Sequence, residues 1–227
     1  MQAVILAAGE GIRLRPLTLE RPKPLIEVEG KTLLEHNLDQ LVGLVDEVVI
    51  VIGYKGDMIK EYISDEYQSM KIKYVEQKEQ LGTGHALMQV NKLIKGKFIL
   101  LMADDLYNKD DISVCAEHEL CVLAKRVTNP ERFGVFVLED NKIKNVIEKP
   151  DTFVGNLINT GFYVLDRRIF DELDKIEKSE RGEYELTDAL KNLAQKFDVF
   201  CEEVKHYHIP IGYPEDLEEA KKILKDI

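Results

Sequence analysis

A basic segment near the N-terminus contains the residues best suited to chemistry. The apolar run 3–6 is followed by Gly9, Gly11 and Arg13, and Lys23 comes ten residues later. Glycines let a backbone approach an anion closely, and their free N–H groups can form a concave nest for phosphate oxygens. The arginine and the lysine add full positive charges. The segment therefore predicts a polyphosphate site at the end of a first strand.

The two best-known phosphate loops do not fit these residues. The dinucleotide fingerprint needs a third glycine that opens a helix, but Pro16 and Pro22 indicate that the loop continues. Residues 30–32 match the end of the Walker pattern, but Leu25 stands where the pattern requires its first glycine. Residues 32–35 have the signature of a capping box, so Lys31 is expected only to precede a helix.

The whole segment closely resembles the signature of sugar-1-phosphate nucleotidyltransferases, enzymes that make nucleoside-diphosphate sugars. The matching residues are Leu6, Ala7, Ala8, Gly9, Gly11, Arg13, Leu14, Pro16, Leu17 and Thr18, followed by Pro22, Lys23, Pro24 and Leu25. The resemblance implies that the nucleotide contacts Leu6, Ala8, Gly9, Gly11, Arg13 and Lys23. Of these, Arg13 and Lys23 are expected to be catalytic.

Apolar runs and helical spacings predict the elements that position these residues. Short runs rich in β-branched residues, without alternation, are typical of buried parallel strands. They alternate with helices, which predicts an α/β, doubly wound, mostly parallel Rossmann-like sheet. Strands are expected at 3–6, 48–52, 72–75 and 98–102, and helices at 33–42, 57–63 and after Gly84.

From residue 120 the pattern changes to shorter strands separated by turn residues, which predicts a smaller, partly antiparallel, sugar-binding subregion. We expect one domain, 1–227, with a nucleotide-binding half (1–110) and a sugar-phosphate half (111–227). Strands are expected at 122–125, 134–138, 142–147, 159–165 and 199–204, and helices at 168–173, 186–196 and from Pro214 onward.

Ligands of open α/β sheets bind at the carboxyl ends of the strands. We therefore expect the basic loop to meet residues 77–85 and the pair 104–105. Residues 77–86 resemble the family's base-reading segment, which implies that Gln77, Gly82 and Thr83 contact the nucleobase. An amide offers a donor and an acceptor together, which suits a pyrimidine edge. Taken alone, the two glycines of this segment fit an ordinary loop before a helix equally well.

Two acidic residues, Asp104 and Asp105, follow the apolar strand 98–102. By the resemblance, Asp104 is the Mg²⁺ ligand and a catalytic residue. Magnesium commonly binds one or two carboxylates together with substrate phosphates and water, so a carboxylate at a strand end suits it. The alternative is a solvated pair that caps a helix.

Three further segments, 132–135, 147–150 and 159–163, resemble the family's sugar-phosphate segments and occur in the family order. The resemblance implies that Gly134 offers backbone contacts and that Glu148 and Asn159 bind sugar hydroxyls. Lys149 is expected to bind the sugar phosphate and to act in catalysis. A fourth match, at 182–188, is interpreted as structural, near the start of a helix.

The sequence departs from the family pattern at Pro210, where relatives often carry a second Mg²⁺ ligand. Proline cannot coordinate the ion through its side chain. His208 stands where relatives have a tryptophan, and we expect it to be a packed loop residue. Metal binding would then depend on Asp104, Asp105, phosphates and water.

Composition limits the remaining possibilities. A net charge of −11 disfavours polymeric nucleic acid as a partner. No apolar run approaches the ~20 residues of a membrane span, and no leader precedes the first strand, so we expect a soluble cytoplasmic protein. The unpatterned cysteines Cys115, Cys121 and Cys201 are expected to be reduced and structural.

The predicted activity is Mg²⁺-dependent transfer of a nucleotidyl group from a nucleoside triphosphate to a sugar 1-phosphate, releasing pyrophosphate. UTP or dTTP is expected, and of the two we favour UTP. One alternative is a catalytically weak regulatory relative that binds nucleotide sugars. Another is cytidylyl transfer to a different phosphorylated alcohol such as phosphocholine, which would need an aromatic cage. The sequence lacks the β-helix of acetyltransferase relatives, so no acetyl transfer is expected, and a homo-oligomer remains open.

Overall fold

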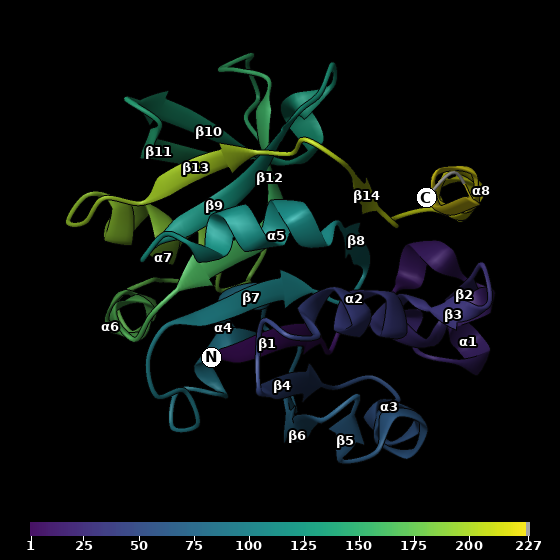
Figure 1. The fold of residues 1–227 in the computed structure, drawn as a ribbon. Coiled ribbons are helices and arrows are strands. Elements are labelled where there is room, and N and C mark those ends of the chain that lie inside the picture. The colour runs from purple at the N-terminus through teal and green to yellow at the C-terminus, as the bar shows by residue number, and fades with distance from the viewer. Residues whose placement is uncertain (226–227) are drawn as a thin grey trace.

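A mixed sheet of ten strands forms the framework of residues 1–225, the part of the chain that the structure, a computed structural model, describes (Figure 1). The strand order is β10-β11-β13-β9-β12-β7-β1-β4-β6-β5. The strands are β1 (Gln2–Ala7), β4 (Glu47–Ile52), β5 (Glu66–Tyr67), β6 (Met70–Glu76), β7 (Phe98–Met102), β9 (Cys121–Arg126), β10 (Gly134–Glu139), β11 (Lys142–Glu148), β12 (Leu157–Leu165) and β13 (Phe200–Glu203).

The centre of the N-terminal half is parallel. β1 pairs in parallel with both β4 and β7, and β4 pairs in parallel with β6. These strands run through the middle of the molecule, and the apolar runs that predicted β1, β4 and β7 are buried along almost their whole length. Their carboxyl ends therefore meet at one edge, where the loops that follow them can converge.

Alternating side chains of β1 build two separate cores. Val4 and Leu6 belong to one apolar cluster, and Ala3 and Ile5 belong to the other. This alternation follows from the two-residue period of a strand, and it makes a three-layer α/β/α arrangement. Helices α4 (Thr83–Met88), α6 (Arg168–Leu173) and α7 (Leu186–Ala194) pack on the first face, and α2 (Leu33–Leu41), α3 (Gly56–Ile63) and α5 (Lys109–Ala116) on the second.

The other side of the sheet is mostly antiparallel. β12 pairs antiparallel with β7 and β9, and β10 pairs antiparallel with β11, whereas β13 runs parallel to β9. The register of β12 shifts between Asn159 and Phe162, which is a bulge next to the cleft described below. Bulges of this kind commonly redirect side chains beside a binding site.

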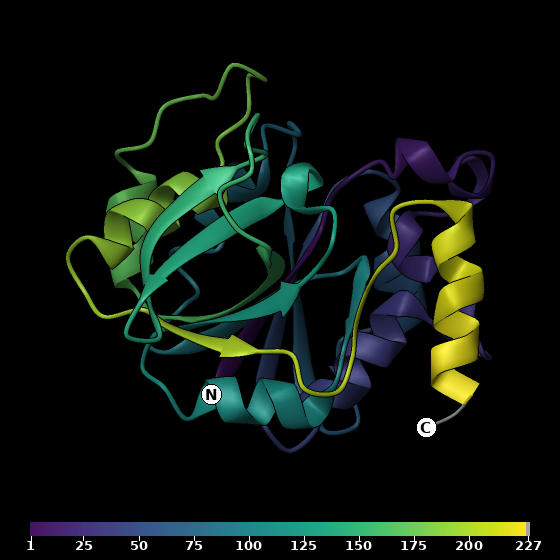
Figure 2. The same cartoon turned by 90° about the horizontal axis from the view of Figure 1, so that it is seen from above.

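A third, smaller core joins the C-terminus to the N-terminal loops. It contains Leu14, Ile26, Ile211 and Leu217 among its buried members. Figure 2 shows α8 (Pro214–Lys225) lying along the N-terminal segments. The elements gathered here are η1 (Ile12–Leu14), α1 (Leu17–Glu20), η2 (Lys23–Leu25), the pair β2 (Glu27–Val28) and β3 (Lys31–Thr32), and the pair β8 (Asp105–Tyr107) and β14 (His208–Pro210).

The α/β class and the partly antiparallel second half are confirmed, and several details are corrected. Lys31 precedes α2 and the capping box of Thr32 and Glu35 is present, both as predicted, and in addition Lys31 belongs to the short strand β3. α7 ends at Ala194 because the predicted apolar stripe stops there. His208 lies in β14 and not in a loop, because its strand finds a partner in β8. The division of the chain near residue 110 stays a prediction.

Candidate active site

A cleft of about 830 Å³ opens at the carboxyl ends of the central strands. The loop after β1, the segment after β6 and the residues after β7 all line it, as predicted from the parallel topology. Its predicted lining residues are Leu6, Ala8, Gly9, Gly11, Arg13, Lys23, Gln77, Gly82, Thr83, Asp104, Gly134, Glu148 and Asn159. A volume of this size suits a nucleotide-sized ligand.

The phosphate loop depends on Gly11, which has φ +64° and precedes η1. A Cβ at this position would approach Thr18 Cγ2 at 2.9 Å and Lys23 Cβ at 3.0 Å. The Thr18 hydroxyl donates to the Gly11 carbonyl at 3.0 Å, and the amide of Leu14 donates to it as well. The loop is therefore held tightly around a backbone position that only glycine satisfies.

Lys23 and Asp104 form an ion pair across the floor of the cleft. Lys23 Nζ lies 2.5 Å from Asp104 Oδ2, and the lysine side chain is only 8% exposed. Asp104 lies deep in the molecule, but its side chain is 41% exposed because it faces the open cleft. The pair connects the loop after β1 to the end of β7, so the fold places a cation and an anion together on the cleft floor.

The pKa of Asp104 lies below its ordinary value. Burial alone would raise that pKa, but the charge of Lys23 and its hydrogen bond outweigh burial, with a further contribution from Arg13. Asp104 is therefore ionised at neutral pH. An ionised carboxylate open to a cleft is the kind of group that Mg²⁺ binds.

The predicted base-reading segment holds Gln77 in one orientation. Gln77 is buried, and its amide nitrogen donates to the Gly82 carbonyl at 3.1 Å and lies 3.0 Å from His85 Nδ1. Because a carbonyl can only accept, the Gly82 carbonyl requires the amide nitrogen on its side. The Gln77 oxygen therefore points elsewhere, as a hydrogen-bond acceptor.

The glycines of this segment pack directly against another loop. A Cβ at Gly82 would lie 2.7 Å from the Tyr184 carbonyl, and one at Gly84 would lie 2.8 Å from the same oxygen. The Thr83 hydroxyl accepts a hydrogen bond from the Leu186 amide at the start of α7. The base-reading segment is thus fixed to the segment that precedes α7, which the sequence interpretation took as structural.

The sugar side of the cleft contains a carboxylate network. Glu148 Oε2 accepts a hydrogen bond from the Thr187 hydroxyl at 3.3 Å, and Arg181 lies between Glu148 (3.5 Å) and Glu185 (2.8 Å). Burial and then the charge of Glu185 raise the pKa of Glu148. A Cβ at Gly134 would meet Glu148 Oε2 at 2.9 Å, so glycine leaves the space that this carboxylate occupies.

Asn159 and Lys149 complete the predicted sugar residues but differ in position. Asn159 lines the cleft, donates to the Tyr163 hydroxyl at 2.6 Å and accepts from the Gly161 amide at 3.0 Å. Lys149 is exposed, has φ 42° and is absent from the cleft lining. The structure therefore brings together all the predicted residues except Lys149.

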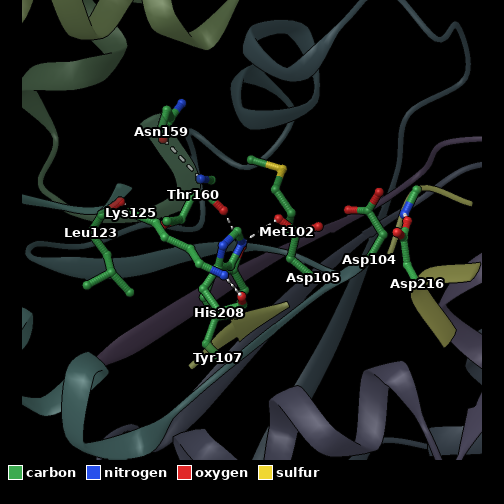
Figure 3. Close-up of polar contacts among 12 residues, drawn as sticks. Met102, Asp104, Asp105, Tyr107, Leu123, Lys125, Asn159, Thr160, His208 and Asp216 are labelled. Carbon is green, nitrogen blue, oxygen red and sulfur yellow. Dashed lines mark hydrogen bonds and ion pairs between the residues drawn. The ribbon is translucent and has the colours of Figure 1, made fainter. Parts of the chain in front are cut away.

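At the cleft floor the buried His208 pairs with Asp105, which is partly exposed and lines the cleft beside Asp104 (Figure 3). His208 Nε2 lies 2.9 Å from Asp105 Oδ2, and the His208 carbonyl accepts from Lys125 Nζ at 2.7 Å. The Tyr107 ring packs on the histidine, and its hydroxyl donates to the Thr160 carbonyl at 2.9 Å. Asp105 thus turns toward the protein interior to meet His208, whereas Asp104 turns toward the cleft.

Pro210 pairs with Asp105 in the β8–β14 ribbon and does not line the cleft. The residue after it, Ile211, donates its amide to the Asp104 carbonyl at 3.1 Å. No group of three or more His, Cys, Asp or Glu side chains that could enclose a metal ion occurs within residues 1–225. A metal at this site would therefore take most of its ligands from phosphates and water.

Several lining residues were not predicted as functional, among them Arg132, Arg181, Tyr163 and Glu185. Arg132 and Tyr163 stand inside the segments that resemble the family's sugar-phosphate segments, so a signal for them existed. Arg181 precedes the segment interpreted as structural. That interpretation was incomplete, because the segment also lines the cleft.

Comparison with known proteins fits this geometry. The sequence profile of the nucleotidyl transferase family matches residues 2–226. The chain belongs to the nucleotidyl transferase family. The chain is 42% identical to the bifunctional protein GlmU of Methanococcus maripaludis, over 97% of this chain and 53% of that protein. It therefore spans about half the length of the first curated relatives that it matches.

A relative of similar length and two solved structures extend the comparison. The UTP–glucose-1-phosphate uridylyltransferase AglF of Haloferax volcanii is 39% identical over 100% of this chain and 97% of that protein. A UDP-glucose pyrophosphorylase complexed with UDP-glucose is 25% identical, with a TM-score of 0.88 over 99% and 98% of the two chains. A putative glucose-1-phosphate thymidylyltransferase from Bacillus anthracis, 23% identical over 100% and 96% of the chains, shares the fold with a TM-score of 0.90.

Among the described helices of this family member, none combines the length and apolar character needed to cross a membrane. All three cysteines are buried and unpaired, as predicted. Burial raises the pKa of the Cys201 thiol to about 12. That thiol is therefore protonated at neutral pH.

Proposed function

We propose that this protein transfers a uridylyl group from UTP to a sugar 1-phosphate and releases pyrophosphate. The observation that supports the proposal most strongly is the ion pair on the cleft floor between the buried Lys23 and the cleft-facing Asp104, with Arg13 in the same cleft. The likeness to AglF, which extends over nearly its whole length, supports the same reaction class.

The reaction depends on neutralising the charge of two phosphate anions more than on proton transfer. A phosphate monoester has its second pKa near ~6, so a sugar 1-phosphate is already largely ionised at neutral pH. One of its oxygens attacks the α-phosphorus of UTP, a new P–O bond forms, and the α–β bridging bond breaks with its electrons on pyrophosphate. No general base is required, but two anions must be brought together.

The chain's own cations can neutralise that repulsion. Lys23 is buried and held by Asp104, so it offers a fixed charge to the triphosphate at little reorganisation cost. Arg13, at the mouth of the cleft, offers a planar fork suited to phosphate oxygens. Holding both substrates in one cleft supplies the alignment that an in-line displacement needs.

Asp104 is the residue that would hold Mg²⁺, because it is ionised and open to the cleft. The ion accepts a shell made mostly of phosphate oxygens and water, so one protein carboxylate suffices. Bound there, it would supply further neutralisation of phosphate charge. Lys23 would then share Asp104 with the ion and keep the carboxylate in place.

The orientation of Gln77 supports a uracil or thymine base over cytosine. Its amide nitrogen is used by the Gly82 carbonyl, which leaves the amide oxygen as an acceptor. N3 of uracil and thymine carries a hydrogen and can donate to this oxygen, whereas N3 of cytosine accepts and cytosine could donate only through its exocyclic amine. Cytidylyl transfer is therefore the weaker alternative, and the site favours UTP or dTTP.

On the sugar side, Glu148 and Asn159 are proposed to bind hydroxyl groups and Lys149 the phosphate. Glu148 on β11 and Asn159 on β12 both line the cleft, from two strands that each pair with β10, and offer an acceptor and an amide. No aromatic cage for a quaternary ammonium group occurs among the described lining residues, where the aromatic members are Phe133 and Tyr163. This supports a sugar over phosphocholine.

The test is a matrix of UTP, dTTP, CTP and ATP against several sugar 1-phosphates and phosphocholine, with pyrophosphate release measured in the presence of Mg²⁺. The expected result is release with UTP, less with dTTP, and only with a sugar 1-phosphate. Preference for CTP would contradict the assignment of Gln77 to a uracil or thymine base. Preference for phosphocholine would contradict the assignment of Glu148 to a sugar hydroxyl.

Pro210 supports a second candidate, a regulatory relative that binds nucleotide sugars without turnover. Its side chain offers no oxygen where relatives often carry a second metal ligand. Calorimetric binding of UDP-glucose, together with no pyrophosphate release at saturating Mg²⁺ for every substrate pair, would favour that candidate. Release with any pair would exclude it.

A further inference from the structure

Tyr213 lies between two arginines at the mouth of the cleft. Its ring centroid is 5.1 Å from the guanidinium carbon of Arg13 and 5.0 Å from that of Arg132. The tyrosine follows Gly212, which lines the cleft, and precedes α8. One aromatic ring therefore contacts two cations that lie 119 residues apart in sequence.

The two arginines come from opposite sides of the cleft, and both line it. Arg13 belongs to η1 in the phosphate loop, and Arg132 ends η3 (Pro130–Arg132) just before the Gly134 segment. The Arg13 guanidinium also lies close to Gly212, where a Cβ would be 3.6 Å from Nη1. The glycine therefore gives Arg13 room to reach the ring.

Neither guanidinium is neutralised by the protein. Within residues 1–225, Arg13 and Arg132 form no ion pair with a carboxylate, whereas their neighbours Arg15 and Arg181 pair with Glu10 and Glu185. An exposed cation–π contact contributes only about 0.5–1 kcal/mol and removes no charge. The ring thus holds two full positive charges at one place, which a polyanion would complement.

The segment that carries the ring is itself fixed. Asp216 Oδ2 accepts hydrogen bonds from the backbone amides of Gly212 (2.6 Å) and Tyr213 (2.7 Å). Figure 3 shows Asp216 at the same end of the site as Asp104. Hydrogen bonding to Arg13, together with the charge of Arg132, lowers the pKa of the Tyr213 phenol. The carboxylate of Asp216 thus accepts hydrogen bonds from backbone amides and does not pair with Arg13 or Arg132. Both arginines are therefore available to a ligand.

We propose that Tyr213 positions Arg13 and Arg132 as a two-arginine site for the terminal phosphates of the nucleoside triphosphate, the part that leaves as pyrophosphate. This inference rests on the proposed nucleotidyl transfer and adds Arg132 as a binding residue and Tyr213 as a positioning residue. When the α–β bridging bond breaks, the electron pair and the added negative charge stay on pyrophosphate, between the two guanidinium groups.

The position of the arginines relative to Lys23 supports this assignment. Lys23 is buried beside Asp104, at the depth where the reacting phosphorus would meet both substrates. Arg13 and Arg132 are exposed at the opening, from which a leaving group can depart to solvent. The sugar side has its own cation, Arg181, already engaged by Glu148 and Glu185.

The test uses Arg132→Gln, Tyr213→Leu and Tyr213→Phe in the full chain. Arg132→Gln should raise the KM for UTP and the inhibition constant for pyrophosphate by about tenfold or more, since one charge-assisted contact is lost. The KM for the sugar 1-phosphate should stay within about twofold, because the contact that is lost belongs to the other substrate. Tyr213→Phe keeps the ring but removes the hydroxyl that is hydrogen-bonded to Arg13, so its KM for UTP should fall between those of the wild type and Tyr213→Leu.

Tyr213→Leu removes the ring and should reproduce the Arg132→Gln phenotype. In the double variant Arg132→Gln/Tyr213→Leu, the rise in the KM for UTP should be smaller than the product of the rises in the two single variants, because the ring acts through the arginines. Arg126→Gln is the matched control, since Arg126 is an exposed arginine on β9 that pairs with Glu203 outside the cleft. Its kinetic constants should equal those of the wild type.

Calorimetric titration with inorganic pyrophosphate separates this inference from the proposed function. Weaker pyrophosphate binding in Arg132→Gln than in Arg126→Gln supports the site even when turnover is not observed. Equal pyrophosphate binding in the two variants would overturn it. An increase confined to the sugar 1-phosphate KM would overturn it as well, by assigning Arg132 to the other substrate. Absence of turnover in the wild type would contradict the proposed function alone.

Discussion

Lys23 and Lys149, the lysines expected to face the two substrates, are held in opposite ways by the fold. Lys23 is 8% exposed and ion-paired with Asp104 on the cleft floor. Lys149 is exposed, takes a left-handed φ of 42° and forms no ion pair within residues 1–225. The proposed nucleotide side is thus organised by the protein's own contacts, whereas on the proposed sugar side Arg181 lines the cleft and Lys149 lies outside it.

The strand arrangement explains this difference. On the nucleotide side, parallel strands end at one edge, so the loops after β1 and β7 meet and their charges pair. On the sugar side, the acidic residues Glu148 and Asp188 have pKa values raised by burial and by the charge of Glu185. Arg181 only partly offsets that negative charge. A phosphate drawn in by Lys149 would bring a second anion there, so we expect the sugar side to adjust more on binding.

The largest effect is expected from Lys23→Ala. Loss of one preorganised charge-assisted contact costs about 2–4 kcal/mol in a transition state, so turnover should fall by at least about 30-fold. Asp104 would also lose the partner that lowers its pKa. Steady-state pyrophosphate release is the measurement. Lys31→Ala, which removes an exposed lysine paired with Asp39, is the control. Equal losses of turnover in the two variants would contradict a specific role for Lys23.

Asp104→Asn and Asp105→Asn should have different effects: the first should lower turnover, and the second should lower the free energy of unfolding. Asp104 faces the cleft, so its variant should lose about tenfold or more in turnover and need more Mg²⁺. Asp105 faces His208, so its variant should mainly lower the free energy of unfolding, by about 1–3 kcal/mol. Metal titration of activity and urea unfolding measure the two effects. A larger activity loss in Asp105→Asn would move the metal site by one residue.

Lys149→Ala should have a smaller and more selective effect than Lys23→Ala. Because Lys149 is not part of a preformed pair, we expect about a tenfold increase in the KM for the sugar 1-phosphate and little change for UTP. Initial rates at varied concentrations of each substrate measure this. An equal rise in both constants would show that the two lysines do not serve separate substrates, and the comparison between the two sides would fail.

The smallest expected effect concerns Glu172 on α6 and the pH dependence of the free energy of unfolding. Glu172 is separated in sequence from both Lys23 and Lys149. Burial opposes ionisation, but hydrogen bonds from Lys196 and Lys175 outweigh it and lower the pKa of Glu172. A lowered folded-state pKa gives stability that is present above the unfolded value and is lost as pH falls through the folded value.

Glu172→Gln should therefore be less stable than the wild type at pH 7 by on the order of 1 kcal/mol, since the lysine partners are exposed. That difference should shrink at pH 3, below the usual glutamate pKa of about 4.3. Denaturant unfolding at the two pH values measures it. A difference that stays constant would mean that the ion pairs contribute nothing and that packing explains the effect.

The parallel core and the nucleotide side were predictable because their signals are local. Apolar runs identified β4 and β7, and a capping box marked the start of α2. Topology then placed the loop after β1 beside Asp104. Helix α5 was not predicted, because its acidic first turn and weak apolar stripe resemble a solvated loop.

The β8–β14 ribbon could not be predicted from sequence. Each strand has three residues, and the two lie about a hundred positions apart, so neither carries a period that identifies its partner. For the same reason His208 was expected in a loop; Arg132 stands in a segment that was matched to the family, but its contact with Tyr213 has no local signal. Their environments depend on Asp105 and Tyr213, which approach them only in the folded chain.

The third core has a consequence for synthesis. Leu14, next to the phosphate-binding residues, is buried by a cluster that includes Ile211, Leu217 and Ala220 from the end of the chain. Because synthesis runs from the N-terminus, the loop after β1 emerges from the ribosome well before these residues. The emerging chain can therefore form its parallel strands early, but it acquires a settled phosphate loop only after α8 has been made.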